Sequence, residues 1–69
     1  MKIHFSRAFC TRNVDHDLIS IPADVAIDTS VMFNSQGEIV SFYLRPSFDA
    51  SAIVLIDSLA SMKISFVLE

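Results

Sequence analysis

Several residue types that small domains rely on are scarce in this chain of 69 residues, which has one glycine, one cysteine and no tryptophan. The single cysteine, Cys10, excludes an internal disulfide and a four-cysteine zinc site. The single glycine, Gly37, excludes a glycine-rich phosphate-binding loop. We therefore expect one domain, residues 1–69, that is stabilised by dense packing or by association, because so short a chain has a small core and no covalent staple.

Charge is also scarce, and it is unevenly distributed. Five basic and eight acidic residues give a net charge of −3. The first twelve residues contain three bases and no acid, whereas residues 13–44 contain five acids and no base. Three scattered bases do not form the dense positive stripe that phosphate contacts require, so the sequence predicts no nucleic-acid partner.

Long apolar runs are absent as well. The longest one, Ala52 to Ile56, is far shorter than the roughly 20 residues that a membrane-spanning helix needs. The start of the chain, Met1–Phe5, leads into Ser6 and Arg7 rather than into the apolar segment of a secretory leader. The sequence therefore predicts a cytoplasmic protein without a membrane partner.

Apolar side chains, in contrast, are abundant, and they make up 52% of the chain. A folded monomer of 7.7 kDa exposes about 4,300 Å² of surface. Since only 19% of the residues are charged, much of that surface is expected to be apolar, which is typical of proteins that bind other proteins. We therefore expect a protein partner, and a homo-oligomer, most simply a homodimer.

Alternation of apolar and polar residues predicts strands in three parts of the chain. Residues 1–9, 18–21 and 63–69 each show this period of two. Residues 10–17 contain turn formers and are expected to be a loop. Residues 22–28 fit two interpretations, namely one helical turn or an extended run with its apolar side chains, Val25 and Ile27, facing inward.

The clearest local signal is a β-hairpin over residues 30–45. Two alternating segments flank Asn34-Ser35-Gln36-Gly37, and Gly37 stands where the turn needs a positive φ. The second segment is apolar on both faces, which predicts a central strand rather than an edge strand.

Residues 50–62 contain no glycine or proline and show apolar residues at helical spacing, so we expect a helix, capped by Ser47 or Asp49. The apolar positions are Ala52, Leu55, Ile56, Leu59 and Met62. The elements in order, ββ(x)ββαβ, predict an α+β fold in which one helix packs on a small antiparallel sheet of four to five strands.

The expected helix also has a narrow polar stripe, and this stripe supplies candidate partner-binding residues. Val54 lies within the stripe, where an isolated monomer would rather carry a charge. We therefore predict that Val54 contacts a partner together with its polar neighbours Ser51 and Ser58.

A second candidate surface lies on the expected hairpin. Tyr43 and Arg45 share one face of the second strand with Ser41, and tyrosine and arginine often anchor protein interfaces. The alternative is a salt bridge from Arg45 to Asp49 or Glu38 at the rim of the sheet.

Few residues suggest chemistry. The run Asp15-His16-Asp17 could bind a divalent metal with help from Cys10 or His4, but neighbouring residues on a loop rarely point at one ion. The same loop with Cys10 contains the residue types of a thiol nucleophile, a base and an orienting acid. Such groups are assembled in space rather than along one loop, so we expect no catalytic residues, no metal and no cofactor.

Asp24 and Asp28 would lie on one face of a helix, but paired carboxylates need a pocket that so small a domain has little room to form. The sequence therefore favours a non-enzymatic protein–protein interaction module, of the kind that phages and mobile elements use to inhibit or regulate a larger host protein. One alternative is a small oligomeric enzyme or metal-binding protein whose site at the subunit interface uses residues 15–17. Another is an antitoxin-like or immunity-like protein whose acidic segment, residues 15–38, covers a basic partner.

Overall fold

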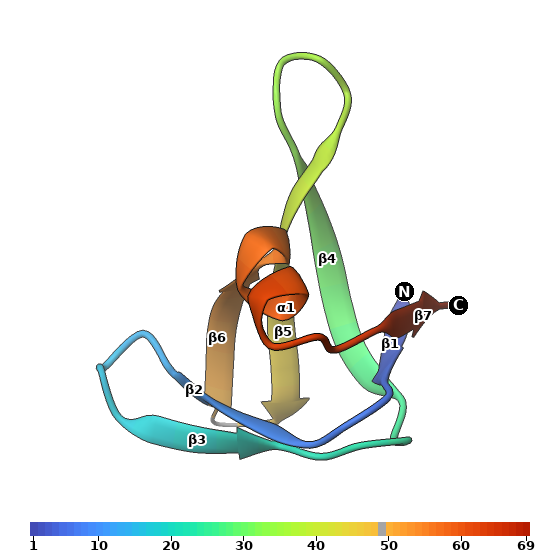
Figure 1. Ribbon diagram of the computed structural model, residues 1–69. Coiled ribbons are helices and arrows are strands. Elements are labelled where there is room, and N and C mark those ends of the chain that lie inside the picture. The colour runs from blue at the N-terminus through green and yellow to red at the C-terminus, as the bar shows by residue number, and fades with distance from the viewer. Residues whose placement is uncertain (49) are drawn as a thin grey trace.

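Most of this chain forms strands, which are arranged in two antiparallel sheets with one short helix (Figure 1). The computed structural model describes residues 1–48 and 50–69. The strands are β1 (Lys2–Phe5), β2 (Phe9–Arg12), β3 (Leu18–Ile21), β4 (Ile27–Phe33), β5 (Ile39–Ser47), β6 (Ala50–Leu55) and β7 (Phe66–Leu68), and the helix is α1 (Ile56–Ser61).

The larger sheet has five strands in the order β6-β5-β4-β1-β7, and every neighbouring pair is antiparallel. A separate two-stranded sheet is formed by β2 and β3. The predicted α+β fold with one helix on a small antiparallel sheet is confirmed, and so is the central position of the second hairpin strand, since β5 lies between β6 and β4. The two-stranded sheet is an addition that the sequence did not indicate.

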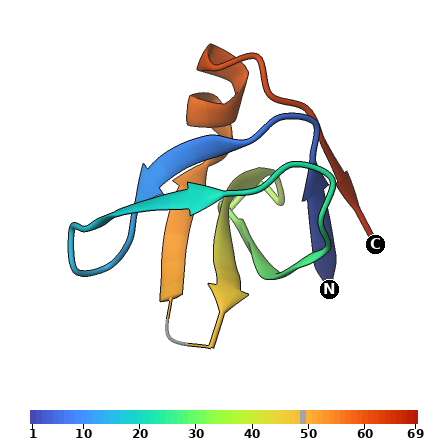
Figure 2. The same cartoon turned by 90° about the horizontal axis from the view of Figure 1, so that it is seen from below.

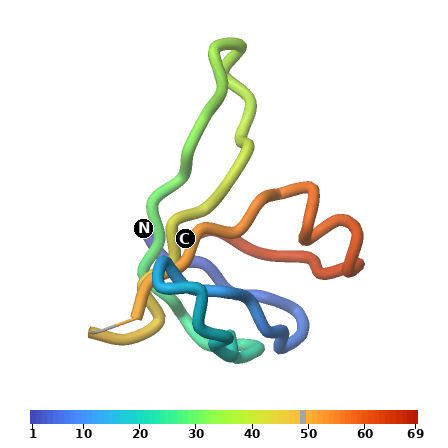
Figure 3. Tube along the Cα trace, turned by 90° about the vertical axis from the view of Figure 1, so that its left-hand side faces the viewer, coloured from blue at the N-terminus to red at the C-terminus, as the bar shows by residue number. Residues whose placement is uncertain are grey.

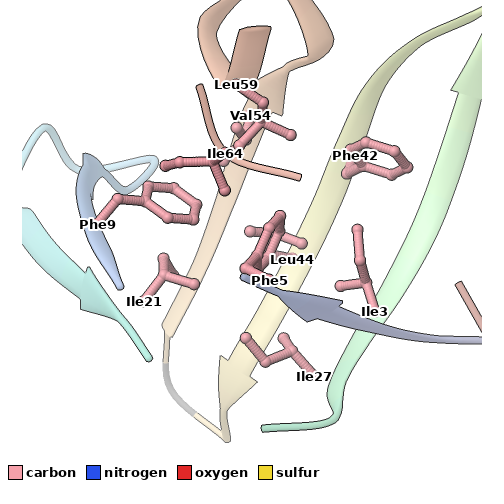
Figure 4. Close-up of a cluster of buried hydrophobic side chains, with 10 residues drawn as sticks. All are labelled: Ile3, Phe5, Phe9, Ile21, Ile27, Phe42, Leu44, Val54, Leu59 and Ile64. Carbon is pink, nitrogen blue, oxygen red and sulfur yellow. The ribbon is translucent and has the colours of Figure 1, made fainter. Parts of the chain in front are cut away.

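The core lies between the five-stranded sheet and the elements that cover one of its faces. In the side view of Figure 3, α1 and the β2–β3 hairpin lie on the same side of the larger sheet. Figure 4 shows their apolar side chains meeting those of the sheet. The core residues are Ile3, Phe5, Phe9, Ile21, Ile27, Phe42, Leu44, Val54, Leu59 and Ile64.

Aromatic rings connect the layers of this core. The rings of Phe5 and Phe9 meet edge to face with their centroids 5.0 Å apart, and those of Phe42 and Phe66 do so at 4.9 Å. The whole chain exposes 4516 Å², close to the surface expected for its mass. The monomer is therefore as compact as an ordinary small domain.

The first part of the chain differs from the prediction. The expected strand over residues 1–9 is interrupted at residues 6–8, and the expected loop over residues 10–17 is shortened because β2 extends to Arg12. This bend lets β2 cross over the larger sheet (Figure 2), so that Phe9 reaches the core beside Phe5 (Figure 4). The Arg7 guanidinium donates to the Met62 carbonyl and thereby links the bend to the end of α1.

Residues 22–26 form neither the helical turn nor the extended run that the sequence allowed, and the strand begins only at Ile27. Ile27 opens β4 and is buried, as expected, but Val25 is 48% exposed and so its predicted inward position is wrong. Asp24 adopts a left-handed φ of 57° and its backbone N–H donates to the Phe5 carbonyl. The chain turns here towards β4. This turn explains why Val25 is exposed and Ile27 is buried, although the two residues are only two positions apart.

The largest correction concerns residues 50–62. The expected helix spans only Ile56–Ser61, whereas residues 50–55 form the edge strand β6. The residues of β6 alternate in burial, and Val54 lies opposite Phe42 while Ile53 lies opposite Tyr43. Pairing with β5 supplies backbone hydrogen bonds and a core contact that an isolated sequence does not reveal. Leu55, not Ser47, precedes the helix, and Asp49 lies outside the described residues.

The end of α1 is fixed by a Schellman motif. The N–H of Ile64 donates to the Leu59 carbonyl, and the N–H of Lys63 donates to the Ala60 carbonyl. Lys63 has the left-handed φ of 56° that this motif requires, and Ile64 packs in the core with Leu59. Within the described part of the chain, no helix has the length and apolarity needed to cross a bilayer.

Candidate functional site

The face of the five-stranded sheet opposite α1 is not covered by any element of the described residues (Figure 3). We call it the outer face. Strand alternation and the cross-strand registers assign its residues, which are Lys2, His4, Asp28, Ser30, Met32, Ser41, Tyr43, Arg45, Ser51, Ile53, Leu55, Val67 and Glu69.

One half of the outer face is apolar. Ile53 and Leu55 of the edge strand β6 are 52% and 54% exposed, respectively. Tyr43 lies opposite Ile53, and Ser41 lies opposite both Leu55 and Met32. Ser41 is nevertheless buried, because larger side chains flank it on both neighbouring strands. We call Met32, Tyr43, Ile53 and Leu55 the apolar patch, which runs across β4, β5 and β6.

The other half of the outer face carries paired charges. Lys2 Nζ lies 2.6 Å from Asp28 Oδ1. The hydrogen bond from Lys2 and its positive charge lower the pKa of the Asp28 carboxyl, and Arg45 adds a smaller effect in the same direction. His4 Nε2 lies 3.0 Å from Glu69 Oε1. Lys2 and Asp28 therefore neutralise one another on this half of the outer face.

Arg45 joins the two halves of the outer face. Its guanidinium carbon lies 5.4 Å from the centroid of the Tyr43 ring, and its Nη1 is 3.4 Å from Ser30 Oγ. The alternative salt bridge to Glu38 is not formed, since the Glu38 carboxylate accepts from Asn34 instead. The alternative partner Asp49 lies outside the described residues.

The structure brings together three of the five residues predicted to bind a partner. Tyr43, Arg45 and Ser51 lie on the outer face, although Ser51 does so as part of a strand and not of a helix. The expected exposure of Val54 is wrong, because it is only 3% exposed and packs in the core. Ser58 is exposed on α1, away from the outer face.

The prediction missed the two most exposed apolar residues of the patch. The helical spacing gives no signal for Ile53, and it predicts that Leu55 lies in the core as part of a helix. Reading residues 50–55 with a period of two would have placed Ile53 and Leu55 together on the side opposite Val54. The sequence did not favour that interpretation, because residues 52–56 are apolar without interruption and residues 52–62 also show helical spacing.

A groove of about 430 Å³ lies between β2 and α1. It is lined by Cys10, Thr11, Asp57, Ser58, Ser61 and Met62. No imidazole lines this groove, and Cys10 therefore has no histidine base beside it there. The predicted candidate Ser58 belongs to this groove and has no contact with the outer face.

A smaller pocket of about 190 Å³ contains His4, Ser6, Asp24 and Ser65 beside three apolar residues. These are residue types of a hydrolytic site, but their contacts are structural. The hydroxyl of Ser6 accepts from the Ser65 backbone N–H, and His4 Nε2 faces Glu69 rather than a serine. The pocket therefore lacks the nucleophile–base hydrogen bond that such chemistry requires.

The acidic loop with His16 forms a turn. The side-chain oxygen of Asn13 accepts from the backbone N–H groups of Asp15 and Asp17, both at 2.9 Å. The Arg12 guanidinium donates to the His16 carbonyl at 2.8 Å. Among the described residues, no three His, Cys, Asp or Glu side chains are grouped in a way that could hold a metal ion. The structure thus accounts for this loop as a turn between β2 and β3.

Comparison with known proteins adds no relative: the chain matches no family model, no curated protein and no solved structure.

Proposed function

We propose that this chain is a non-catalytic protein-interaction module that binds another protein through its outer face. The observation that carries the proposal is the exposure of Ile53 and Leu55 beside Tyr43 on a sheet face that no described element covers. Contiguous apolar side chains on an open sheet face mark protein-binding surfaces, because burying them releases water.

The residue types on the outer face favour binding over catalysis. Tyrosine and arginine supply much of the energy at protein interfaces, and the contact between Tyr43 and Arg45 holds both side chains in place beside the patch. Ser51 and Ser30 add small polar groups at its border. An apolar centre with a polar rim is the usual arrangement of a specific interface.

The same residues define the chemistry of the partner. The patch requires an apolar protein surface. The balance of basic and acidic side chains around it, such as Lys2 with Asp28, requires a surface without a strong net charge. A strongly basic partner, as in the antitoxin-like alternative, has less support. The acids of residues 15–38 are dispersed, since Asp28 pairs with Lys2 on the outer face while Glu38 contacts Asn34 in the hairpin turn.

Position-specific cross-linking tests this proposal. A photoreactive phenylalanine analogue at position 53, introduced in the cells that naturally make the chain, should form a covalent protein adduct. The matched control carries the same analogue at position 18, because Leu18 is 62% exposed on β3 and lies outside the outer face. Adducts that depend on position 53 support the proposal, whatever their mass. Equal labelling at positions 53 and 18 would overturn it.

A further inference from the structure

The outer face itself has the two properties expected of its partner, namely apolar side chains and no strong net charge. We propose that the partner is a second copy of this chain and that two copies bind outer face to outer face. The inference rests on the proposed function, because it names the occupant of the same surface. It is carried by the charge balance of the outer face and by the exposed side chains of the apolar patch.

Charge distribution favours this face over the rest of the molecule. The outer face carries two basic residues, Lys2 and Arg45, and two acidic ones, Asp28 and Glu69. Its charges therefore cancel, and the net charge of −3 belongs to the remainder of the chain. Two copies with the same net charge repel each other least where their surfaces are neutral. Contact through the outer faces directs the acidic remainder of each copy away from the other.

The apolar patch is suited to contact with itself. In a dimer with two-fold symmetry the same surface of each copy forms the interface, so the patch meets an identical patch. Ile53, Leu55 and Tyr43 would then be buried by side chains of similar size. Two sheets that pack face to face lie about 10 Å apart, a spacing that side chains of this size fill.

Association would give the sheet a second covered face, so that β5 would be enclosed on both sides, as its apolar sequence suggested.

Sedimentation velocity of the purified chain tests the inference. At tens of micromolar, the wild-type protein should sediment with twice the chain mass of 7.7 kDa. Ile53→Lys should shift it to the monomer and raise the dimer dissociation constant roughly tenfold or more, because a charge would enter an apolar interface. The matched control Leu18→Lys places the same charge at a residue that is 62% exposed on β3, and it should remain dimeric.

Circular dichroism of each variant establishes that it is folded. A wild-type monomer at this concentration would overturn the inference, and so would equal dissociation by Ile53→Lys and Leu18→Lys. The proposed function is judged separately. A monomeric pure protein that still cross-links from position 53 to a different protein in cells would refute the second copy as partner and retain the interaction module.

Discussion

Two turns in this protein use the same set of hydrogen bonds. In the β4–β5 turn, the Asn34 side-chain oxygen accepts from the backbone N–H groups of Gln36 and Glu38, both at 2.9 Å. The Gly37 N–H donates to the Asn34 carbonyl, and the Asn34 N–H donates to Glu38. Asn13 makes the equivalent four bonds in the β2–β3 turn. An asparagine at the first position therefore closes both hairpins.

The residue with left-handed φ distinguishes the two turns. Gly37 has a φ of 81°, whereas His16, at the equivalent place, has a φ of 66°. For a residue with a Cβ atom, this left-handed conformation is unfavourable by about 1–2 kcal/mol. His16 thus occupies a position where glycine would fit better, and its place beside two aspartates reflects the turn rather than a metal site.

The first prediction follows from this comparison. His16→Gly should raise the free energy of unfolding by about 0.5–1 kcal/mol, because the relieved backbone strain exceeds the extra entropy of glycine in the unfolded chain. Urea denaturation measures the change. The control is Asp15→Gly in the same turn, where no positive φ is found and where glycine should lower stability slightly. A loss of stability in His16→Gly would show that the imidazole makes a contribution that the turn geometry does not explain.

At the scale of elements, the junction between β6 and α1 is the most informative part of the chain. The strand passes directly into the helix at Leu55–Ile56 with no connecting loop. Residues 50–62 thus satisfy two periods at once, since Val54 follows the alternation of β6 and Leu59 lies on the buried side of α1. Pairing with β5 decides that the first half is a strand.

The second prediction separates strand from helix at two neighbouring residues. Val54→Lys should destabilise the fold by about 3 kcal/mol or more, because it puts a charge into the core opposite Phe42. Ile53→Lys should change stability by no more than about 0.5 kcal/mol in the monomer, since Ile53 faces outward. Urea denaturation at concentrations below those of association measures both.

The loss of stability expected for Leu59→Ala serves as a reference for a substitution in the core. Leu59 is 1% exposed, and its truncation should cost about 2–5 kcal/mol. The assignment of β6 would be contradicted if Val54→Lys were as mild as Ile53→Lys. In that case residues 50–55 would have to turn Val54 towards solvent, as in the helix expected from sequence alone.

At the scale of the whole molecule, one face of the five-stranded sheet is covered and the other is exposed. One face is closed by α1, β2 and β3 and forms the core, while the outer face keeps Ile53, Leu55 and Val67 more than half exposed. A single copy of the chain thus forms a complete core, and it still exposes apolar side chains on the outer face. This division explains how so apolar a sequence can form a compact domain and still expose apolar side chains on one face of its sheet.

The third prediction links this surface to stability. If two copies bind only in the folded state, the melting temperature should rise with chain concentration by mass action. An increase of about a hundredfold in concentration should raise it by several degrees in the wild type. Leu55→Lys, on the outer face, should melt at the same temperature at every concentration. A wild type with no such dependence would argue against association through this surface.

Local patterns in the sequence determined the elements whose stability depends on near neighbours. The hairpin around Gly37, the strand over residues 18–21 and the need for a positive φ at the turn are all confirmed. Each depends on contacts a few residues apart, so a period of two and one glycine are enough to identify them. The total exposed area could also be predicted, because it follows from chain mass.

Only the tertiary structure decided which side chains are buried in the second half of the chain. Val54 became a core residue, and Ile53 became exposed, when β6 paired with a strand that precedes it in sequence. The same pairing placed Ser51 on the outer face with Tyr43 and Arg45. Sheet pairing joins residues far apart in the chain, and its energy depends on the partner strand, so the period within one segment cannot determine it.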